Sequence, residues 1–558
     1  MDVNYYGILE INDRVSYGVC KNGSFKKFKS VYPTNDTFYV NTKKQFQTIN
    51  IIAIIRLTGN VSNNGTKIGT IHEYIGDIND NNNLKKMYEK IALDNWSTDK
   101  QLKKLVTDNC ENHEIYNDGV YERLDMTDCE VYSIDPDNCE DIDDALSIRH
   151  IGNRTEIGIH ISDVSSHVSR MSVIEMEIKK RIESVYLMND TLTVHNMLPL
   201  GFMEKCTLKE NCDKNAVSVL LYYDNDMIMI ESKIVRTVVN VRKNLTYDEA
   251  NKFIENMDGV VYELFDFSKK IQNKEQKYNN SHNKYDSHDM VELYMILANK
   301  KVAEVMHNDI KFGVYRTQKN KQKSKCKSIL RKCDYDADTN EKILKARNNI
   351  NMLSATYMLY ESDINDISSN LVNLKHEALD IDLYTHFTSP MRRYFDIIVH
   401  RILFNEINKN DIKDLGVVID CINNEHCKYK KIYDRYDKIS KIEAMLKCDE
   451  YIDNGFITSD GYVIDMNNNE MSIYISKYDM IIKKKIVHDR IIDKIKMEYV
   501  KDTDIVSEIN IECLGNHVTI SLFQKVTVYI SYREKSINRF VYDIQELMNI
   551  IDDYNDIL

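Results

Sequence analysis

Residues 133–148 read S-I-D-P-D-N-C-E-D-I-D-D-A-L-S-I, a stretch that places six carboxylates within ten residues, between two short apolar segments. The six acidic residues are Asp135, Asp137, Glu140, Asp141, Asp143 and Asp144. Two such charges about 4 Å apart repel by roughly 1 kcal/mol in water and by about 4 kcal/mol at an intermediate dielectric constant. The carboxylates therefore either face the solvent separately, as an acidic loop, or share a multivalent cation.

The segment after the acidic stretch predicts a rigid frame for it. A-L-S-I-R-H, from residue 145, alternates like a strand, and T-E-I-G-I-H-I-S-D-V, from residue 155, returns after a turn at Gly152. We expect the acidic loop to open a hairpin, with Asp163 at the end of its second strand. An amphipathic helix is predicted from residue 171 to near Tyr186, and another over Asp289–Met306.

Length, charge and cysteine content limit the class of protein. A chain of 558 residues is too long for one hydrophobic core, so we expect two to four domains. The net charge of −13 argues against coating nucleic acid through bulk charge, although it allows a local basic channel. The twelve cysteines include no C-x-x-C pair, and we interpret them as free thiols in the cytoplasm or another reducing intracellular compartment. The N-terminus lacks a secretion signal and no apolar run approaches 18 residues, so we expect neither secretion nor a membrane span.

Both ends of the chain are predicted to form small β domains. The strands expected near the N-terminus are Tyr6–Ile11, Val15–Cys20, Thr37–Val40, Asn50–Leu57 and Lys67–Ile71. Five short strands in under a hundred residues suit a barrel such as the OB fold, and another small β domain fits the pattern equally well. From about residue 448 the pattern is again that of strands, so we predict a second small β barrel there.

A second informative stretch, residues 384–404, reads Y-T-H-F-T-S-P-M-R-R-Y-F-D-I-I-V-H-R-I-L-F. Ser389 and Pro390 predict a helix start, with Ser as the N-cap and Pro as the first helical residue. Arg392 and Arg393 then fall in the first turn, where a cation opposes the helix dipole at a cost of about 0.3–1 kcal/mol. A phosphate bound by the free N–H groups and the guanidinium groups would explain them, and an ion pair with a nearby Asp is the alternative.

The acidic residues also indicate which cation they would bind. Asp supplies hard oxygen ligands, which favour Mg²⁺ or Mn²⁺. A calcium loop of the EF-hand type does not fit, because the sixth position counted from Asp135 is Glu140 rather than Gly, and the twelfth is Leu146. Clustered Asp, the arginine pair and flanking β barrels together point to a metal-dependent enzyme that acts on a phosphate backbone.

These motifs resemble the ribonuclease II / ribonuclease R family, the RNB exoribonucleases. The family's catalytic motif is similar to S-I-D-P-D-N-C-E-D-I-D-D-A-L, followed here by G-I-H-I-S-D-V. A second family motif resembles Y-T-H-F-T-S-P-M-R-R-Y-F-D-I-I-V-H-R-I-L. The resemblance implies an α+β multidomain protein. Its mixed α/β RNB catalytic domain would occupy residues 101–447, flanked by a cold-shock-like OB-fold domain at 1–100 and a C-terminal OB-like RNA-binding domain at 448–558.

The resemblance also implies roles for individual residues. The metal ligands would be Asp135, Asp141, Asp143 and Asp144, and the catalytic residues Asp141, Asp143 and Arg392. The predicted RNA-binding residues are Tyr186, at the 3′-terminal nucleotide, together with Tyr247, Glu292 and Arg393. Arg393 is expected to contact RNA or to give structural support. Of these residues, Asp143 is expected to be the most sensitive to substitution.

The implied activity is hydrolysis of single-stranded RNA from a free 3′ end to 5′-nucleoside monophosphates, by water attack assisted by two Mg²⁺ or Mn²⁺ ions. No membrane and no obligate protein partner are expected. The chain departs from the family pattern in several places: the C-S-L segment reads Cys206-Thr207-Leu208, Lys214 stands where Arg is usual, Gln318 stands where His is usual, and the region from 266 to 287 is shorter than expected. A non-catalytic RNA-binding protein on the same scaffold is therefore the alternative, and a calcium-binding or structural protein is the third interpretation.

Overall fold

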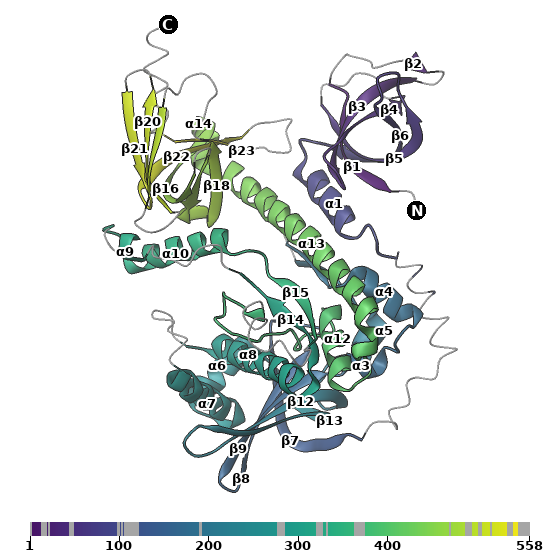
Figure 1. The fold of residues 1–558 in the computed structure, drawn as a ribbon, viewed down its shortest axis with the longest axis vertical. Coiled ribbons are helices and arrows are strands. Elements are labelled where there is room, and N and C mark those ends of the chain that lie inside the picture. The colour runs from purple at the N-terminus through teal and green to yellow at the C-terminus, as the bar shows by residue number, and fades with distance from the viewer. Residues whose placement is uncertain are drawn as a thin grey trace. The chain divides into compact units, whose positions relative to one another are not determined.

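The computed structural model of the chain divides into two compact units, whose elements are labelled in Figure 1. The first unit comprises residues 1–94, 320–353 and 431–558, and the second comprises residues 95–319 and 354–430. The structure describes residues 3–12, 19–20, 23–43, 49–97, 101, 104, 122–188, 192–275, 285–319, 327–330, 333–361, 374–467, 470–485, 494–499, 505–513, 516–532 and 540–544. The predicted domain bounds at residues 100 and 447 stay predictions.

The N-terminal part of the first unit is a closed β barrel. Its strands are β1 (Asn4–Glu10), β2 (Val19–Cys20), β3 (Gly23–Tyr32), β4 (Thr37–Thr42), β5 (Ile51–Val61) and β6 (Lys67–Asp77). The sheet order is β1-β5-β6-β4-β3, and β1 also pairs with β3, which closes the ring. Only the β4–β6 pairing is parallel, an arrangement typical of the OB fold. Helix α1 (Asn81–Ala92) follows, capped by the Asp80 side chain.

The pattern of buried residues in this barrel explains which of its strands could be predicted from the sequence. Leu9, Phe28, Val40 and Ile55 are all buried in it. Strand β3 was not predicted, because three lysines surround Phe28 in S-F-K-K-F-K-S and obscure the apolar alternation. Of the predicted strand Val15–Cys20, the first four residues lie outside the described residues, and the last two form β2.

The C-terminal part of the first unit is a β domain with two sheets around one hydrophobic core. One sheet has the order β18-β17-β16-β22-β23, and the other has the order β19-β20-β21. The strands are β16 (Phe456–Met466), β17 (Glu470–Ile475), β18 (Met480–Lys485), β19 (Lys494–Tyr499), β20 (Val506–Cys513), β21 (Asn516–Ser521), β22 (Lys525–Tyr532) and β23 (Phe540–Ile544). Helices α9 (Lys327–Leu330), α10 (Ala337–Asn351) and α14 (Asp449–Asn454) belong to the same unit. Strands follow residue 448 as expected, but the described residues form two sheets here rather than the single closed barrel that was predicted.

The second unit is organised around a closed five-stranded barrel with the order β12-β13-β7-β8-β9. Its strands are β7 (Leu124–Asp135), β8 (Asp144–Ile151), β9 (Arg154–Ser162), β12 (Asp213–Tyr223) and β13 (Met229–Thr246). The predicted hairpin after the acidic loop is confirmed: β8 and β9 pair from Asp144↔Ile161 to Ile151↔Arg154, and Gly152 turns with φ +60°. Strands β7 and β13 are parallel, which aligns Asp135 with Thr246.

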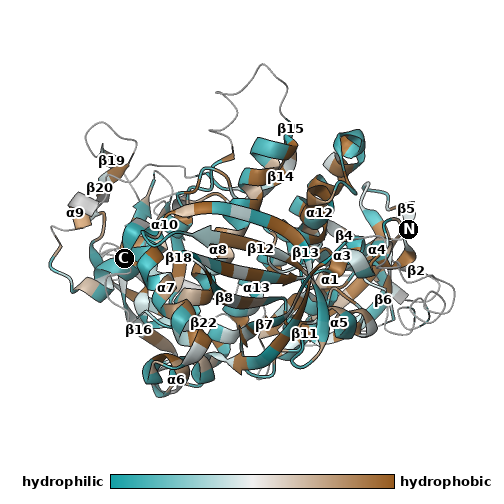
Figure 2. Cartoon of the chain, turned by 90° about the horizontal axis from the view of Figure 1, so that it is seen from below, coloured by the Kyte–Doolittle hydropathy of each residue, from teal (hydrophilic) through white to brown (hydrophobic). Residues whose placement is uncertain are grey.

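Helices and two short hairpins complete the second unit. The helices are α3 (Val164–His167), α4 (Val173–Arg181), α5 (Leu200–Cys206), α6 (Tyr247–Asn256), α7 (Gly259–Glu275), α8 (Ser287–Val305), the π-helix η2 (Met306–Ile310), α12 (Tyr394–Leu403), the 3₁₀ turn η3 (Lys409–Asp411) and α13 (Ile412–Leu446), whose last residues belong to the first unit. The hairpins are β10 (Val185–Met188) with β11 (Leu192–His195), and β14 (Phe312–Thr317) with β15 (Thr356–Glu361). Figure 2 shows hydrophobic and hydrophilic residues following one another along these elements.

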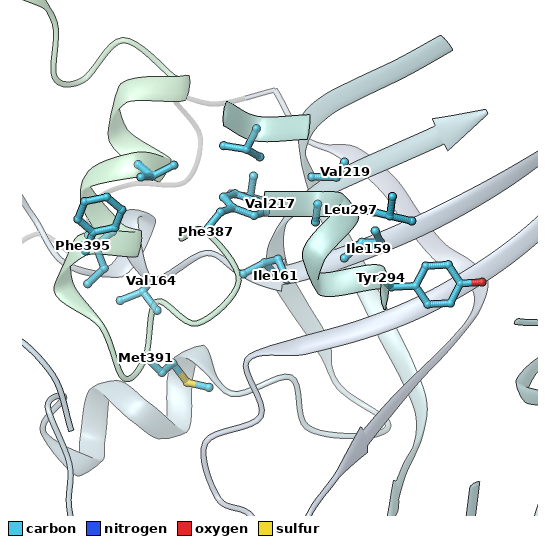
Figure 3. Close-up of a cluster of buried hydrophobic side chains, with 14 of the residues drawn as sticks. Ile159, Ile161, Val164, Val217, Val219, Tyr294, Leu297, Phe387, Met391 and Phe395 are labelled. Carbon is cyan, nitrogen blue, oxygen red and sulfur yellow. The ribbon is translucent and has the colours of Figure 1, made fainter. Parts of the chain in front are cut away.

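The main core of this unit lies where the barrel meets helices α8 and α12. Figure 3 shows side chains of β9, β12, α8 and α12 in this cluster, together with Phe387 of the loop before α12. Its labelled residues include Ile159, Ile161, Val217, Val219, Tyr294, Leu297, Phe387 and Phe395. Burying each such apolar side chain contributes about 1.5–3 kcal/mol. The core thus fixes the barrel against the segment that carries the second motif.

The predicted helix over Asp289–Met306 is confirmed as α8. The helix expected to reach Tyr186 is shorter, because α4 ends at Arg181 and Ile182 has a positive φ of 68°. Tyr186 lies instead on β10, paired with Val194 of β11. Among the described residues, none of the helices combines the length and apolar character needed to cross a bilayer.

Candidate active site

The acidic loop joins two paired strands of the barrel. Asp135 ends β7 and Asp144 begins β8, and the two strands pair at Val131↔Ser147 and Tyr132↔Leu146. The loop is therefore held at both ends by the barrel. This placement fixes the backbone from which all four predicted metal ligands project.

Threonine 207 holds the middle of the loop. Its hydroxyl donates to the Glu140 carbonyl at 3.0 Å and accepts from the Ile142 N–H at 3.1 Å. The Ile142 carbonyl accepts from the Leu208 N–H at 3.0 Å, and the Ser162 N–H donates to the Asp143 carbonyl at 2.8 Å. The first three of these bonds come from Thr207 and Leu208 and hold the acidic loop in place. The sequence spacing did not reveal this role for the C-T-L segment at residues 206–208.

Asp143 is buried and faces the second motif. Its Oδ1 accepts from the Met391 N–H at 2.9 Å, and its Oδ2 lies 3.7 Å from Nε of Arg392. Among the residues that the structure describes, Oδ2 has no hydrogen-bond partner. Burial raises the pKa of Asp143 well above its usual range, and the charge of Arg392 acts in the opposite direction. The structure thus brings together two of the three predicted catalytic residues, Asp143 and Arg392.

The other carboxylates are also partly deprived of water. Burial raises the pKa of Asp144, with a further contribution from the charge of Asp135. Burial likewise raises the pKa of Asp135, whose Oδ2 finds no hydrogen-bond partner within the described part of the chain. A buried polar atom without a partner costs about 1–3 kcal/mol, and more when it is charged. Keeping these carboxylates in their charged forms takes more positive charge than Arg392 supplies.

A divalent cation fits this need. The four aspartates offer hard oxygen ligands, and two of them present buried oxygens without a partner. In the part of the chain that the structure describes, no three His, Cys, Asp or Glu side chains are already close enough to form a ligand cluster. Mg²⁺ is usually bound by one or two carboxylates together with water and substrate phosphates, so an open arrangement suits it better than a closed cage would.

Two tyrosines border the carboxylates. The Tyr186 hydroxyl, on β10, donates to Oδ2 of Asp141 at 3.1 Å. Tyr247 follows Thr246, which is aligned with Asp135 across the β13–β7 pairing. Burial, followed by the charges of Asp144 and Asp135, raises the pKa of Tyr247 to about 12. Both tyrosines therefore lie near the acidic loop, where they were expected.

The predicted helix start at Ser389 and Pro390 is wrong. Helix α12 begins at Tyr394, and the preceding residues form a turn in which the Arg392 and Arg393 N–H groups donate to the Ser389 carbonyl, at 3.3 and 3.0 Å. Arg393 is extended because its backbone forms a bridge with Glu183. This long-range pairing, rather than the Ser-Pro signal, sets the start of the helix.

The two arginines have different surroundings. Arg393 forms an ion pair with Asp396 at 2.8 Å, and its side chain is only 17% exposed. Asp396 also accepts from the Ser389 N–H at 2.8 Å, so this pair supports the turn. Arg392 is 45% exposed and donates to the Ser389 hydroxyl at 2.9 Å. Pairing with a nearby Asp therefore accounts for Arg393, whose contact with RNA stays a prediction, whereas Arg392 is available to a ligand.

Helix α8 carries one predicted residue and one unexpected residue. Glu292 is exposed, as expected for a residue beside the apolar stripe of the helix. His288, one turn earlier, stacks on Tyr247 with ring centroids 3.6 Å apart. The i, i+4 spacing of His288 and Glu292 is the sequence signal that could have identified this histidine.

Lys214 and Gln318, two of the departures from the family pattern, lie away from the acidic loop. Nζ of Lys214 donates to the carbonyls of Glu204 and Lys205, at 3.0 and 3.1 Å, near the end of α5. Gln318 forms a backbone bridge with His376. Neither residue belongs to the acidic loop or to the turn that carries Arg392.

Comparison with known proteins identifies the family. The family model described as RNB domain matches residues 123–409. Ribonuclease R of Chlamydia pneumoniae is 25% identical over 400 residues, which cover 64% of this chain and 58% of that protein. DIS3-like exonuclease 2 of Schizosaccharomyces pombe is 25% identical over 545 residues, covering 83% of this chain and 56% of that protein. The chain thus spans little more than half the length of these curated relatives.

Solved structures share the fold. The apo form of Mycoplasma genitalium RNase R has a TM-score of 0.71 at 19% identity, covering 97% of this chain and 90% of that one. Yeast Ssd1, a pseudonuclease, has a TM-score of 0.70 at 12% identity, covering 98% of this chain and 83% of that one. At such identities the likeness establishes the fold alone, so the chemistry must be argued from this chain's own residues.

Proposed function

Because the chain belongs to the RNB domain family, we propose that it is a metal-dependent 3′→5′ exoribonuclease that releases 5′-nucleoside monophosphates from single-stranded RNA. The observation that carries the proposal is the contact between Asp143 and Arg392, in which Nε of the arginine lies 3.7 Å from Oδ2 of the aspartate. This buried oxygen has no hydrogen-bond partner among the described residues. A buried acid beside an exposed arginine is suited to a phosphodiester, whose negative charge increases in the transition state.

Asp135, Asp141, Asp143 and Asp144 would hold Mg²⁺ or Mn²⁺. When bound, such ions would polarise the scissile phosphate and lower the pKa of the attacking water. Arg392 contributes a guanidinium group that can contact a phosphate oxygen and stabilise its developing charge. Tyr186 keeps Asp141 oriented through its hydroxyl and presents a ring to the terminal nucleotide. Tyr247 lies beside the acidic loop, and Glu292 is one turn of α8 beyond His288, which stacks on Tyr247; both would contact the last nucleotides.

The RNA would reach this site as a single strand with a free 3′ end. OB-type barrels bind such strands through base stacking and backbone contacts, which need no particular sequence. Mycoplasma genitalium RNase R, which shares the fold, has been solved with ribose methylated single-stranded RNA and with double-stranded RNA. We propose RNA as the substrate class of this chain as well, because the chain has its own acidic loop and Arg392.

The proposal is tested with 5′-labelled single-stranded RNA and Mg²⁺. We expect the wild-type protein to produce a ladder that shortens from the 3′ end, and Asp143→Asn to abolish it. Asp137→Asn is the matched control, because Asp137 is exposed and lies in the same loop. A blocked 3′ end should stop the reaction. RNA binding without shortening by the wild-type protein would contradict the proposal.

The alternative is a non-catalytic RNA-binding protein. Its support is the fold shared with yeast Ssd1, a pseudonuclease. The presence of all four aspartates and of Arg392 favours catalysis, since a protein that only binds RNA has no need for buried acids with unpartnered oxygens. The same ladder assay separates the two functions.

A further inference from the structure

The Tyr247–His288 pair is a flat aromatic stack with one open side. The ring centroids are 3.6 Å apart and the ring planes differ by 7°. Tyr247 is half-buried, whereas the His288 side chain is 63% exposed. One face of the imidazole covers the tyrosine, and the remainder of the ring is open to the solvent.

Hydrogen bonds hold this stack in place. The Ser287 hydroxyl donates to the Tyr247 carbonyl at 3.3 Å, and the Ser287 N–H donates to Oδ1 of Asn251 at 3.1 Å. These bonds tie the start of α8 to α6. Asp286 caps α8, and its Oδ1 accepts from the His288 N–H at 2.8 Å and lies 3.5 Å from Nδ1 of the ring. The orientation of the imidazole is therefore set before any ligand binds.

The stack also lies beside the proposed catalytic carboxylates. Thr246, the residue before Tyr247, is aligned with Asp135 in the β13–β7 pairing. The charges of Asp144 and Asp135 contribute to the raised pKa of the Tyr247 phenol, as expected for a hydroxyl that approaches them. Glu292 follows His288 by four residues, so both lie on one side of α8.

We propose that the open face of His288 is a stacking platform for a nucleobase next to the 3′ end of the bound RNA. This inference rests on the proposed function, because it requires RNA at the acidic loop. Every base has a π face, so stacking on an aromatic ring accepts any sequence, as an exonuclease acting one nucleotide at a time requires. His288 would be a positioning residue: it holds the base while the phosphate lies at Asp143 and Arg392.

The test uses Asp143→Asn as a background in which RNA is bound without being cleaved. Single-stranded RNA carries 2-aminopurine at the terminal, second or third nucleotide from the 3′ end, because stacking quenches its fluorescence. We expect quenching at one of these positions. Adding His288→Ala should abolish it and weaken binding about tenfold, within the range measured for base stacking. His288→Phe, which keeps a flat ring, should retain both, and His288→Gln should lose both.

His150→Ala is the matched control, because His150 is a similarly exposed histidine, with 65% of its side chain accessible, on the barrel strand β8. It should leave quenching and affinity unchanged. Quenching and affinity that persist in His288→Ala would overturn the platform while leaving the proposed function intact. If His288→Phe lost as much quenching and affinity as His288→Ala, the platform would also be overturned, because a flat ring at this position would then not be enough to stack a base. A background protein that does not bind RNA at all, measured by anisotropy, would overturn both proposals.

Discussion

Arg392 and Asp143 approach each other from segments almost 250 residues apart, with Nε of the arginine 3.7 Å from Oδ2 of the aspartate. The adjacent Met391 N–H donates to the other oxygen of the same carboxylate at 2.9 Å. One turn therefore supplies both a neutral donor that fixes Asp143 and a cation that is 45% exposed. The guanidinium group donates to the Ser389 hydroxyl at 2.9 Å and remains partly exposed to a ligand, while the Met391 backbone keeps the acid in place.

Replacing Arg392 should reduce turnover much more than RNA binding. We expect Arg392→Gln to lower kcat by about 10²–10³, the range seen when one donor to a developing oxyanion is lost. Arg392→Lys should restore only part of it, because an ammonium group lacks the planar fork of guanidinium. Single-turnover rates and RNA affinity, measured separately, check this expectation. Arg154→Gln, which changes another exposed arginine of this unit, should behave like the wild type.

Removing Arg401 should destabilise the protein strongly. Arg401 is fully buried, forms an ion pair with the buried Glu175, and donates to the Val168 carbonyl at 2.6 Å. Breaking such a pair from one side leaves an uncompensated buried charge, so Arg401→Met should lower the free energy of unfolding by about 3–5 kcal/mol. Urea unfolding measures this loss. Lys342→Met, which removes an exposed pair with Asp338, should cost less than about 1 kcal/mol. Equal losses in the two variants would contradict the expectation.

The sequence predicted those parts of the site that depend on local pattern. The hairpin after the acidic loop follows from the alternation of apolar residues around Gly152, and the core stripe of α8 follows from helical spacing. The predicted start of α12 was wrong because the true start depends on the backbone bridge between Arg393 and Glu183, which no local sequence signal indicates. The stack of His288 on Tyr247 was missed because these residues are 41 positions apart and meet through the packing of α6 and α8, which the bonds of Ser287 support.

His160 should make the protein less stable as the pH falls below neutrality. It is fully buried between the hydroxyls of Ser147 and Ser218, at 2.9 and 2.7 Å, and burial lowers its pKa from 6.5 to about 3. Between these two values the unfolded chain binds a proton that the folded chain does not, so stability falls as the pH decreases from about 6.5. The loss attributable to this histidine should approach about 1.4 kcal/mol per pH unit.

Other groups titrate in the same range, so the informative quantity is the difference between the wild type and His160→Gln. Glutamine keeps a donor and an acceptor for the two serines and does not titrate. Urea unfolding at pH 7, 6, 5 and 4 should give a steeper fall for the wild type than for the variant. Parallel curves would show that His160 is not buried in its neutral form.

The acidic loop should be a source of instability until a divalent cation is bound. Burial raises the pKa values of Asp135, Asp143 and Asp144, which means that the metal-free folded state disfavours their charged forms. In EDTA at pH 8, Asp144→Asn should therefore raise the free energy of unfolding by about 0.5–2 kcal/mol.

Mg²⁺ at a hundred times its Kd should stabilise the wild type by about 2.7 kcal/mol and the variant by less, since ligand binding favours the folded state. Thermal unfolding with EDTA, and with increasing Mg²⁺, measures both effects. Asp137→Asn, in the same loop but exposed, should show neither. A wild-type protein whose unfolding temperature is unaffected by Mg²⁺ would argue against these aspartates as metal ligands in the absence of RNA, and would assign the missing ligands to the phosphates of the substrate.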